Sequence, residues 1–470
     1  MISVDDLNSY LGYLGDPNAI TPNIDKLAES GVAFINAHCQ TPLCGPSRAS
    51  IMTGLRPSTT GIYGMIKDDS IRTNDPLTKS VVFLPEVFKN NGYDVLGVGK
   101  IFHTYAPKDL FKGPGRFVGE KPNNNFGPAP KQRMAWQGYR PGNKNEGPRT
   151  NTDWGAFPDQ DSLVSDFKAA NWAKNQIEKE ITEKPFFLAV GFLKPHVPLH
   201  VPQKWFDMYP LEKIVVPPYL VNDMDDVPEI AKNHISKLAM MPTTDWAIET
   251  DNWKKIIQAY LACVSFVDHQ IGVVLDALKN SQYADNTIVV LWSDHGYRVG
   301  EKGTFAKQAL WEEATRAPLI FSGPGITKNK KINAPVELLS IYPTLLDLCK
   351  LPKNDHNEGI SLTPLMKDQY NGEKLSAITT YGWNNHSVRT INYRYIKYED
   401  GSEELYDKQK DPNEFVNLAN TPQYQKEKEK LALLLPITNN KWNKYSSYSF
   451  EPYFIEQKER VNGLLIGNNH

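Results

Sequence analysis

Cysteine is scarce in this chain of 470 residues, which has only four: Cys39, Cys44, Cys263 and Cys349. Their small number and wide separation exclude a disulfide framework and a structural zinc site built from cysteines. The formal net charge of -2 gives no global reason to expect binding to nucleic acid or to a membrane surface. No apolar run in the sequence is long enough to span a bilayer, so we expect no membrane span.

A signal peptide is also missing from the start of the sequence. Residues 1–6 lack a basic start and an extended apolar core, and they are typical of the second half of a buried strand. We therefore expect further residues, including an export signal, to precede Met1 in the natural protein. The sequence itself gives no localisation.

The composition that remains is ordinary for a globular protein, since 40% of the residues are hydrophobic and 23% are charged. A chain of this length predicts one large domain with an appendage, or two domains. Strand-like and helix-like stretches alternate up to about residue 350, which predicts a mainly parallel sheet with helices on both faces. The predicted strands cover residues 32–35, 93–99, 185–192, 287–292 and 318–321, and the predicted helices cover 21–31, 84–91, 163–179, 253–280 and 338–349.

Two stretches of the chain depart from this alternation. Between residues 105 and 161 Pro, Gly, Asn and Lys dominate, and we predict a long loop region folded over the functional site. After residue 370, short segments at 377–381, 388–398 and 404–406 predict a small antiparallel sheet, with a hairpin turn at 399–402. We therefore divide the chain into a catalytic domain, residues 1–370, and a C-terminal α+β subdomain, residues 371–470.

The most informative stretch is Cys-Gly-Pro-Ser-Arg at residues 44–48, followed by a short helical run that ends in Thr-Gly at 53–54. This order places the sulfur of Cys44 at a helix N-terminus, where unpaired backbone N–H groups and the helix dipole favour negative charge. For Cys44 taken alone, a buried structural thiol is the alternative. The whole string resembles the signature of the type I sulfatases, Cys-x-Pro-Ser-Arg followed by Thr-Gly.

The resemblance implies that Cys44 is oxidised to formylglycine by a maturation enzyme, which would be a partner of this chain. Pro46 and Arg48 would help that enzyme to recognise the cysteine, and Arg48 would later hold the aldehyde hydrate, the nucleophile of this family. The hydrate has a second hydroxyl through which the sulfated residue can release sulfate, whereas a plain serine has none.

Two pairs of potential metal ligands follow predicted strands, Asp5-Asp6 and Asp294-His295. Enzymes with parallel sheets build their sites at the carboxyl ends of strands, and converging carboxylates repel one another unless a hard cation holds them. For each pair alone, a helix cap or a surface turn is at least as good an interpretation. Together they resemble the calcium-binding set of the sulfatases, which implies Ca²⁺, or alternatively Mg²⁺, held by Asp5, Asp6, Asp294, His295 and an oxygen of the modified Cys44.

His295 departs from the commonest pattern, because many sulfatases have Asn at this position and imidazole is a softer ligand than calcium usually selects. The sequence Asp-His-Gly does occur in the iduronate-2-sulfatase branch. Calcium therefore stays the expected ion.

Basic residues follow other predicted strands: Lys100 and His103 come after one, His196 comes after another, and Lys307 follows the Asp294 motif. A lone Lys or His at a strand end is more often a solvated or capping residue than a catalyst. A sulfate ester, however, needs cations at its nonbridging oxygens and a proton donor for its leaving oxygen. The resemblance implies that His196 and Lys307 bind sulfate and protonate the leaving oxygen. It also implies that His103, aided by Lys100, removes a proton from the remaining hydroxyl of the sulfated hydrate so that sulfate is expelled.

The resemblance covers most of the chain. Residues 187–192, the Lys-Pro-His sequence at 194–196 and residues 387–395 are similar to the iduronate-2-sulfatase branch. This implies an α/β fold of the alkaline-phosphatase type, with a mainly parallel sheet between helices and a smaller C-terminal antiparallel-sheet subdomain. It also implies a periplasmic or secreted, calcium-dependent sulfuric ester hydrolase that acts on a sulfated oligo- or polysaccharide.

Two other functions stay open at this point. A phosphatase or phosphonate hydrolase belongs to the same superfamily, but a two-zinc phosphatase is expected to carry Asp-x-x-x-His, and no histidine here lies four residues after an aspartate. A carbohydrate-binding protein with an inactive sulfatase fold is the second alternative, which metal content and activity would distinguish. Basic and aromatic residues that suit sulfated sugars predict either substrate contacts or packing between the two parts of the chain at Trp136, Arg140, Trp383, His386 and Arg389.

Overall fold

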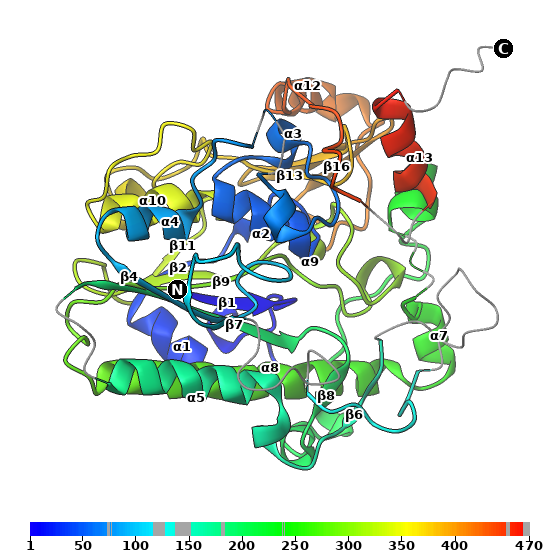
Figure 1. Ribbon diagram of the computed structural model, residues 1–470. Helices are drawn as coiled ribbons and strands as arrows, with labels where there is room; N and C mark the ends of the chain where they lie inside the picture. The colour runs from blue at the N-terminus through cyan, green and yellow to red at the C-terminus, as the bar shows by residue number, and fades with distance from the viewer. Residues whose placement is uncertain are drawn as a thin grey trace.

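The computed structural model describes residues 1–72, 76, 78–115, 127–136, 152–179, 184–236, 238, 240–447 and 452–463. Its centre is an eight-stranded sheet in the order β11-β2-β10-β9-β1-β7-β4-β5. In Figure 1 the sheet crosses the middle of the molecule with helices on both sides. In chain order its strands are β1 (Ile2–Asp5), β2 (Gly31–Phe34), β4 (Asp94–Gly99), β5 (Lys112–Gly115), β7 (Phe186–Pro195), β9 (Val289–Ser293), β10 (Leu319–Ser322) and β11 (Lys330–Ile332).

Neighbouring strands of this sheet pair in parallel except at β10, which is antiparallel to both β2 and β9. Strand β10 begins at the same edge of the sheet at which β9 ends, so the two strands run in opposite directions. A parallel pair would instead need a connection that crosses the sheet, usually through a long helix. The predicted mainly parallel sheet is confirmed. The direction of β10 was not foreseen, since an apolar run does not encode its own direction.

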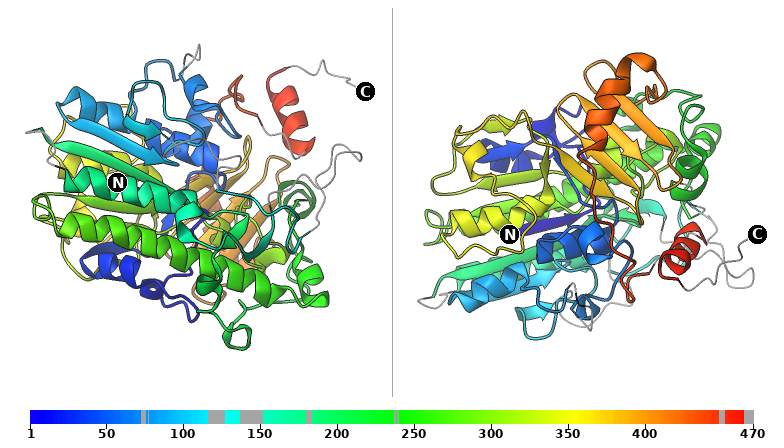
Figure 2. Two further views of the ribbon diagram at one scale, coloured as in Figure 1. Left: turned by 60° about the horizontal axis from the view of Figure 1, so that its bottom comes forward. Right: turned by 90° about the horizontal axis from the view of Figure 1, so that it is seen from above.

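Helices cover both faces of the sheet, as Figures 1 and 2 show. One apolar cluster includes Val4, Val190 and Leu291 and packs under one set of helices, while a second cluster includes Ala189 and Trp292 and packs under the other. Adjacent residues of a strand go to opposite clusters because side chains alternate across a pleated sheet. The first set is α1 (Pro22–Glu29), α5 (Ser165–Glu178) and α8 (Trp253–Lys279), and the second is α2 (Cys44–Thr53), α4 (Leu84–Asn90) and α10 (Ile341–Leu348).

Shorter elements complete the described part of this region. Their bounds are β3 (Ala37–His38), α3 (Pro57–Thr60), β6 (Trp154–Ala156), β8 (Leu199–Val201), α6 (Gln203–Phe206), α7 (Thr244–Glu249), α9 (Glu312–Thr315), β12 (Val336–Glu337) and α11 (Thr363–Met366). The segment 105–161, predicted as loop, contains β5 at the sheet edge and β6, which pairs with β8. Pro114 within β5 is compatible with a strand only because β5 is an edge strand.

Helix α8 corrects the expectation that no stretch is long and apolar enough to span a bilayer. Its 27 residues meet that criterion by length and composition. However, 72% of its apolar window is buried inside the structure, where the helix packs against α1, α5 and β7. A mostly apolar helix that packs against protein in this way is typical of a buried core, so α8 serves here as a core helix.

A second, antiparallel sheet lies in the C-terminal part of the chain, as predicted. Residues 388–398 were expected to form one segment, but they belong to two strands joined by a turn in which Thr390 N–H donates to the carbonyl of Tyr393. The division of the chain at residue 370 stays a prediction. The four strands are β13 (Ala377–Thr380), β14 (His386–Arg389), β15 (Tyr393–Lys397) and β16 (Glu403–Asp407), and α12 (Gln425–Ala432) and α13 (Pro452–Val461) follow.

Buried ion pairs join this sheet to α9. The guanidinium of Arg394 donates to Glu312 at 2.6 Å and to Glu414 at 2.7 Å. Glu312 also accepts from Arg389 Nε at 3.0 Å, and Glu414 accepts from Lys408 at 3.0 Å. All five side chains are at least nine-tenths buried. Positive charges therefore neutralise both glutamates where the C-terminal sheet meets the catalytic part of the chain.

Substituting Arg394→Met should lower the free energy of unfolding by about 3–5 kcal/mol, because it leaves two buried carboxylates short of a cation. Urea unfolding followed by tryptophan fluorescence measures the change. Arg460→Met is the control, since Arg460 is 54% exposed and its pair with Glu399 should contribute at most about 1 kcal/mol. Equal losses in the two variants would contradict a structural role for the buried network.

Candidate active site

The carboxyl ends of β1 and β9 bring the two predicted ligand pairs together. The strands are parallel neighbours with Val4 opposite Ser293, so Asp5-Asp6 and Asp294-His295 leave the sheet at the same edge. Asp6 has a φ of 61°, in the left-handed region, and its N–H donates to Asp294 Oδ1 at 3.3 Å. The turn at Asp6 therefore directs three carboxylates into one buried space.

Helix α2 supplies the sulfur and a guanidinium. Cys44 is the first residue of α2, all ten residues of which are buried. Arg48, about one turn later, donates from Nε to Asp294 Oδ2 at 2.8 Å, and its Nη2 lies 3.7 Å from Asp5 Oδ1. Ser47 Oγ donates to the carbonyl of Asp294 at 2.5 Å. The first turn of α2 is thus fixed directly against the end of β9.

Two lysines neutralise the carboxylates next to Cys44. Lys307 Nζ lies 2.6 Å from Asp6 Oδ1 and 2.9 Å from Cys44 Sγ, and Lys100 Nζ lies 2.5 Å from Asp5 Oδ2. Burial opposes the charge of Lys307, but nearby Asp6 and Cys44 hold its pKa well above the ordinary lysine value. Burial likewise raises the pKa of Asp5, yet the surrounding cations outweigh it and hold that pKa well below its usual range. The site therefore consists of buried, opposite charges.

His196 and His295 present their Nε2 atoms to the same space. His295 Nε2 lies 3.3 Å from Cys44 Sγ, while its Nδ1 lies 2.8 Å from the carbonyl of Gly296. Burial lowers the pKa of His295, which favours the neutral imidazole that binds metals. His196 Nε2 lies 4.0 Å from Asp6 Oδ2, and its Nδ1 lies 2.6 Å from the carbonyl of Val197. In both rings Nδ1–H is positioned to donate to a carbonyl, which leaves Nε2 for the site.

His103 lies beside the start of α2 rather than within the buried cluster. A Cβ built on Gly45 would be 3.7 Å from His103 Cγ, so the ring lies next to the residue that follows Cys44. The ring is half-buried, and the backbone around it is held by Asp68. The structure therefore brings all the predicted catalytic residues to the N-terminus of α2, with His103 at the margin.

The donor set fits a metal ion. Asp5 Oδ1 and Asp6 Oδ2 are buried and have no hydrogen-bond partner, which is a costly arrangement unless a cation takes their lone pairs. Possible ligand atoms lie within 4.8 Å of one another in two overlapping groups, Asp5, Asp6, Cys44 and His196, and Asp5, Cys44, Asp294 and His295. Carboxylate oxygens suit Ca²⁺ or Mg²⁺, and the imidazoles also suit transition metals. His196 was not predicted as a metal ligand, since its sequence context resembled a sulfate-binding site.

The predicted substrate residues have other partners in the structure. Arg389 is bound in the ion-pair network with Glu312, and His386 is 2% exposed, with Nδ1 2.9 Å from Thr380 Oγ1 and burial lowering its pKa to about 4. Trp136 packs against Trp246 with ring centroids 4.6 Å apart. Trp383 Nε1 donates to the carbonyl of Asn439, and Arg140 lies outside the described residues. For Arg389 the pair with Glu312 fits packing between the two parts of the chain, one of the two roles that the sequence left open, and substrate contact stays a prediction for these residues.

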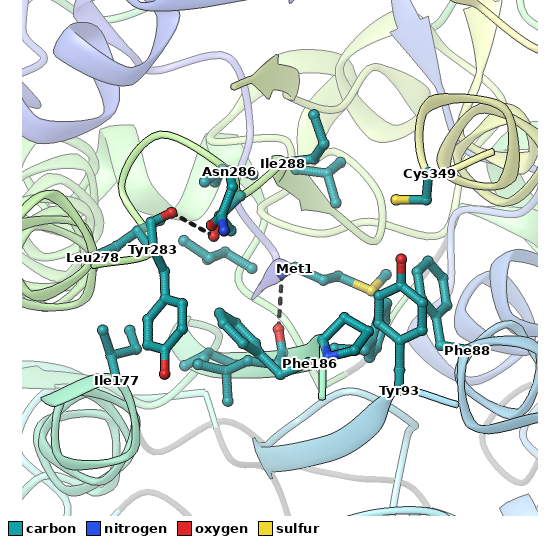
Figure 3. A pocket seen from close by; sticks show the side chains of 18 of the residues that line it. Met1, Phe88, Tyr93, Ile177, Phe186, Leu278, Tyr283, Asn286, Ile288 and Cys349 are labelled. Carbon is teal, nitrogen blue, oxygen red and sulfur yellow. Dashed lines mark hydrogen bonds between the residues drawn. The ribbon is translucent and has the colours of Figure 1, made fainter. Parts of the chain in front are cut away.

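A cavity of about 670 Å³ lies at the opposite edge of the sheet, and Figure 3 shows the side chains that line it. Met1, Phe186 and Ile288 line it, at or just before the amino ends of β1, β7 and β9. Its wall is largely apolar and contains none of the predicted catalytic residues. The candidate site is therefore the charged cluster, in line with the rule that parallel sheets bind ligands at the carboxyl ends of their strands.

Sequence reasoning missed two carboxylates that support the site, Asp68 and Asp166. Asp68 accepts hydrogen bonds from the backbone at His103, and Asp166 accepts them from the backbone at Lys194, two residues before His196. Neither aspartate stands in a recognisable motif, and each lies far in sequence from the loop it contacts. Only the tertiary structure reveals these partners.

The chain is similar to known proteins over nearly its whole length. A family model described as Sulfatase matches residues 1–351, and one described as N-sulphoglucosamine sulphohydrolase, C-terminal, matches residues 300–441. The chain is 56% identical over 466 residues to a protein named Sulfatase from Formosa agariphila, with 98% of this chain and 90% of that protein covered. It is 33% identical over 389 residues to iduronate 2-sulfatase of Mus musculus, with 75% and 68% covered.

Solved structures share the fold. One protein in complex with its substrate D-glucosamine-2-N,6-O-disulfate superposes with a TM-score of 0.72, covering 96% of this chain and 99% of that one. The identity of 20% makes this likeness evidence for the fold alone. The architecture predicted from the sequence, with a mainly parallel sheet and a C-terminal antiparallel sheet, is thus found in a solved protein.

The cluster should retain one divalent cation per chain through dialysis, and Asp294→Asn or Asp5→Asn should lose it, because each removes a charged oxygen ligand. Plasma mass spectrometry of the dialysed proteins measures the bound metal. Asp285→Asn, which changes an exposed carboxylate, is the control. Equal metal content in the site variants and the control would contradict a metal site at the ends of β1 and β9.

Proposed function

The chain belongs to the sulfatase family, whose members hydrolyse sulfate esters, and we propose that it removes sulfate from a sulfated carbohydrate by means of a formylglycine made from Cys44. One observation carries the proposal: Cys44 Sγ, at the start of α2, lies 2.9 Å from Lys307 Nζ and 3.3 Å from His295 Nε2, beside carboxylate oxygens that lack hydrogen-bond partners. The relative named for iduronate supports a sugar sulfate as substrate.

Asp5, Asp6, Asp294 and His295 would hold Ca²⁺ in this proposal. When bound, the ion supplies positive charge for a sulfate group, and the aldehyde hydrate of modified Cys44 supplies the nucleophilic oxygen at the place where Sγ lies. Arg48 offsets part of the negative charge of the metal ligands, because its guanidinium donates to Asp294 and faces Asp5. The same guanidinium lies one turn from residue 44, within reach of a hydrate oxygen.

Lys307 and His196 bind the sulfate group. Neighbouring carboxylates keep Lys307 protonated, so it can donate to a nonbridging sulfate oxygen at neutral pH. With Nδ1 of His196 bonded to a carbonyl, Nε2 is the atom that carries or releases a proton toward the leaving oxygen. These two side chains approach the Cys44 position from different loops, which suits the tetrahedral shape of sulfate.

His103 and Lys100 act in the step in which the sulfated hydrate releases sulfate. His103 lies next to Gly45, on the flank of α2, and it takes a proton from the remaining hydroxyl of the sulfated hydrate at residue 44, so that sulfate leaves and the aldehyde is restored. Lys100 is bound to Asp5 at 2.5 Å and contributes positive charge to the site. The two histidines therefore divide the proton transfers between the departure of the leaving group and the later release of sulfate.

Conversion of Cys44 can be measured directly. After expression together with a formylglycine-generating enzyme, the tryptic peptide with residue 44 should carry an aldehyde in place of the thiol, and sulfate should be released from sulfated oligosaccharides. Cys44→Ala should abolish release, whereas Cys349→Ser, at a half-buried thiol in the distant cavity, should not change it. Full turnover with an unmodified thiol at residue 44 would refute this mechanism.

Lys307→Met should reduce kcat/KM for sulfate ester hydrolysis on the order of 10²-fold or more, as the loss of one donor to a developing anion does in other enzymes. Initial rates of sulfate release by ion chromatography measure the change. Lys112→Met is the matched control, because Lys112 is 71% exposed and pairs with Asp94 on the sheet edge. Faster hydrolysis of the corresponding phosphate ester than of the sulfate ester by the unaltered protein would instead favour a phosphatase.

A further inference from the structure

The two histidines assigned to proton transfer both lie in loops rather than in regular elements. His103 lies in the loop that follows β4, and His196 lies in the loop that follows β7. Proton transfer requires heavy atoms within hydrogen-bond reach, and a displacement of about 1 Å can lower the rate on the order of 10²-fold. Something other than the sheet must therefore hold each loop in place.

One buried carboxylate holds the backbone around His103. Asp68 is 5% exposed and lies in the short 3-10 helix Asp68–Ser70. It accepts three consecutive backbone N–H groups, from His103 at 3.1 Å, Thr104 at 2.6 Å and Tyr105 at 3.1 Å. On the other side of this loop, Arg48 Nη1 donates to the carbonyls of Lys100 and Ile101. The loop is thus held by an anion at its amides and by a cation at its carbonyls.

A second buried carboxylate holds the start of the His196 loop. Asp166, the second residue of α5, is 1% exposed, and its two oxygens accept the N–H groups of Leu193 and Lys194 at 2.8 Å each. The loop then closes on itself, since Lys194 Nζ donates to the carbonyl of Pro198 at 2.5 Å and His196 N–H donates to the carbonyl of Leu193 at 2.9 Å. Asp166 therefore anchors the segment from which the His196 ring projects.

We propose that Asp68 and Asp166 are positioning residues, each of which fixes one of the two proton-transferring histidines of the sulfatase reaction through the backbone of its loop. This inference rests on the roles proposed for His103 and His196. A carboxylate is required because both of its oxygens only accept, whereas the amide of Asn would direct an NH₂ group at one of the backbone N–H groups. Burial raises the pKa of Asp166 to about 6 and also raises the pKa of Asp68. Burial alone therefore disfavours the charged form of both carboxylates.

The two positions predict different kinetic defects. Because His196 serves the leaving oxygen, Asp166→Asn should lower kcat/KM on the order of 10²-fold for poor leaving groups and much less for good ones. Because His103 serves the later release of sulfate, Asp68→Asn should leave kcat/KM nearly unchanged and lower kcat. It should also produce a burst of phenol release from a good aryl sulfate before the slow steady state.

The experiment compares both variants with Asp268→Asn. Asp268 is a matched control, since it is 2% exposed and accepts the N–H groups of Asn23 and Ile24 at 3.1 and 2.8 Å, but it holds α1 and no predicted catalytic residue. Each mature protein is assayed with a series of aryl sulfates of decreasing leaving-group acidity, and its thermal unfolding is recorded. The control should lose stability without a change in the leaving-group dependence or a burst.

The proposal would be overturned if Asp68→Asn and Asp166→Asn behaved like the control, losing stability alone. If either Asn variant does not fold, the Glu variants at positions 68, 166 and 268 are assayed in the same way, because they keep the charge and displace the acceptor. Absence of sulfate release by the unaltered protein with a converted Cys44 is a separate outcome, which would refute the proposed function itself.

Discussion

The convergence of three buried carboxylates at one end of the sheet is the constraint on which the rest of this structure depends. Asp5, Asp6 and Asp294 are fully buried, and their mutual repulsion must be offset by nearby positive charge. Arg48, Lys100 and Lys307 provide that charge from three different loops or helices. Each cation therefore both stabilises the fold locally and prepares the space for an anionic substrate.

The arrangement explains why helix α2 is buried throughout. Its first turn must contact the end of β9 for Arg48 to reach Asp294, and this brings Cys44 within 2.9 Å of Lys307. A helix in such a position cannot present a polar face to solvent, and the residues between Cys44 and Thr53 fit that requirement, since all are small or apolar except Arg48, whose charge is paired with Asp294. The same sequence motif thus satisfies a packing constraint and a chemical one.

Much of the fold and of the cluster could be predicted from the sequence, because apolar runs mark buried strands and the ligand pairs directly follow β1 and β9. The family resemblance of the motif at Cys44 is confirmed by the matches along the chain. What could not be predicted depended on contacts between distant segments: the reversed direction of β10, the edge strand that contains Pro114, and the partners of Arg389. The roles of Asp68 and Asp166 could not be predicted for the same reason. Their partners are backbone amides about 30 residues away, and a backbone amide leaves no pattern of side chains in the sequence.

The burial of α2 sets an order of events during biosynthesis. Once the fold is complete, residue 44 is 1% exposed and its backbone is enclosed in a helix, so a second enzyme cannot bind the surrounding peptide in an extended form. If Cys44 is converted as proposed, conversion must therefore precede closure of the sheet around it. The specific activity of a preparation then depends on the rate of Cys44 modification relative to the rate of folding. Slower synthesis should therefore yield more active molecules from the same number of chains.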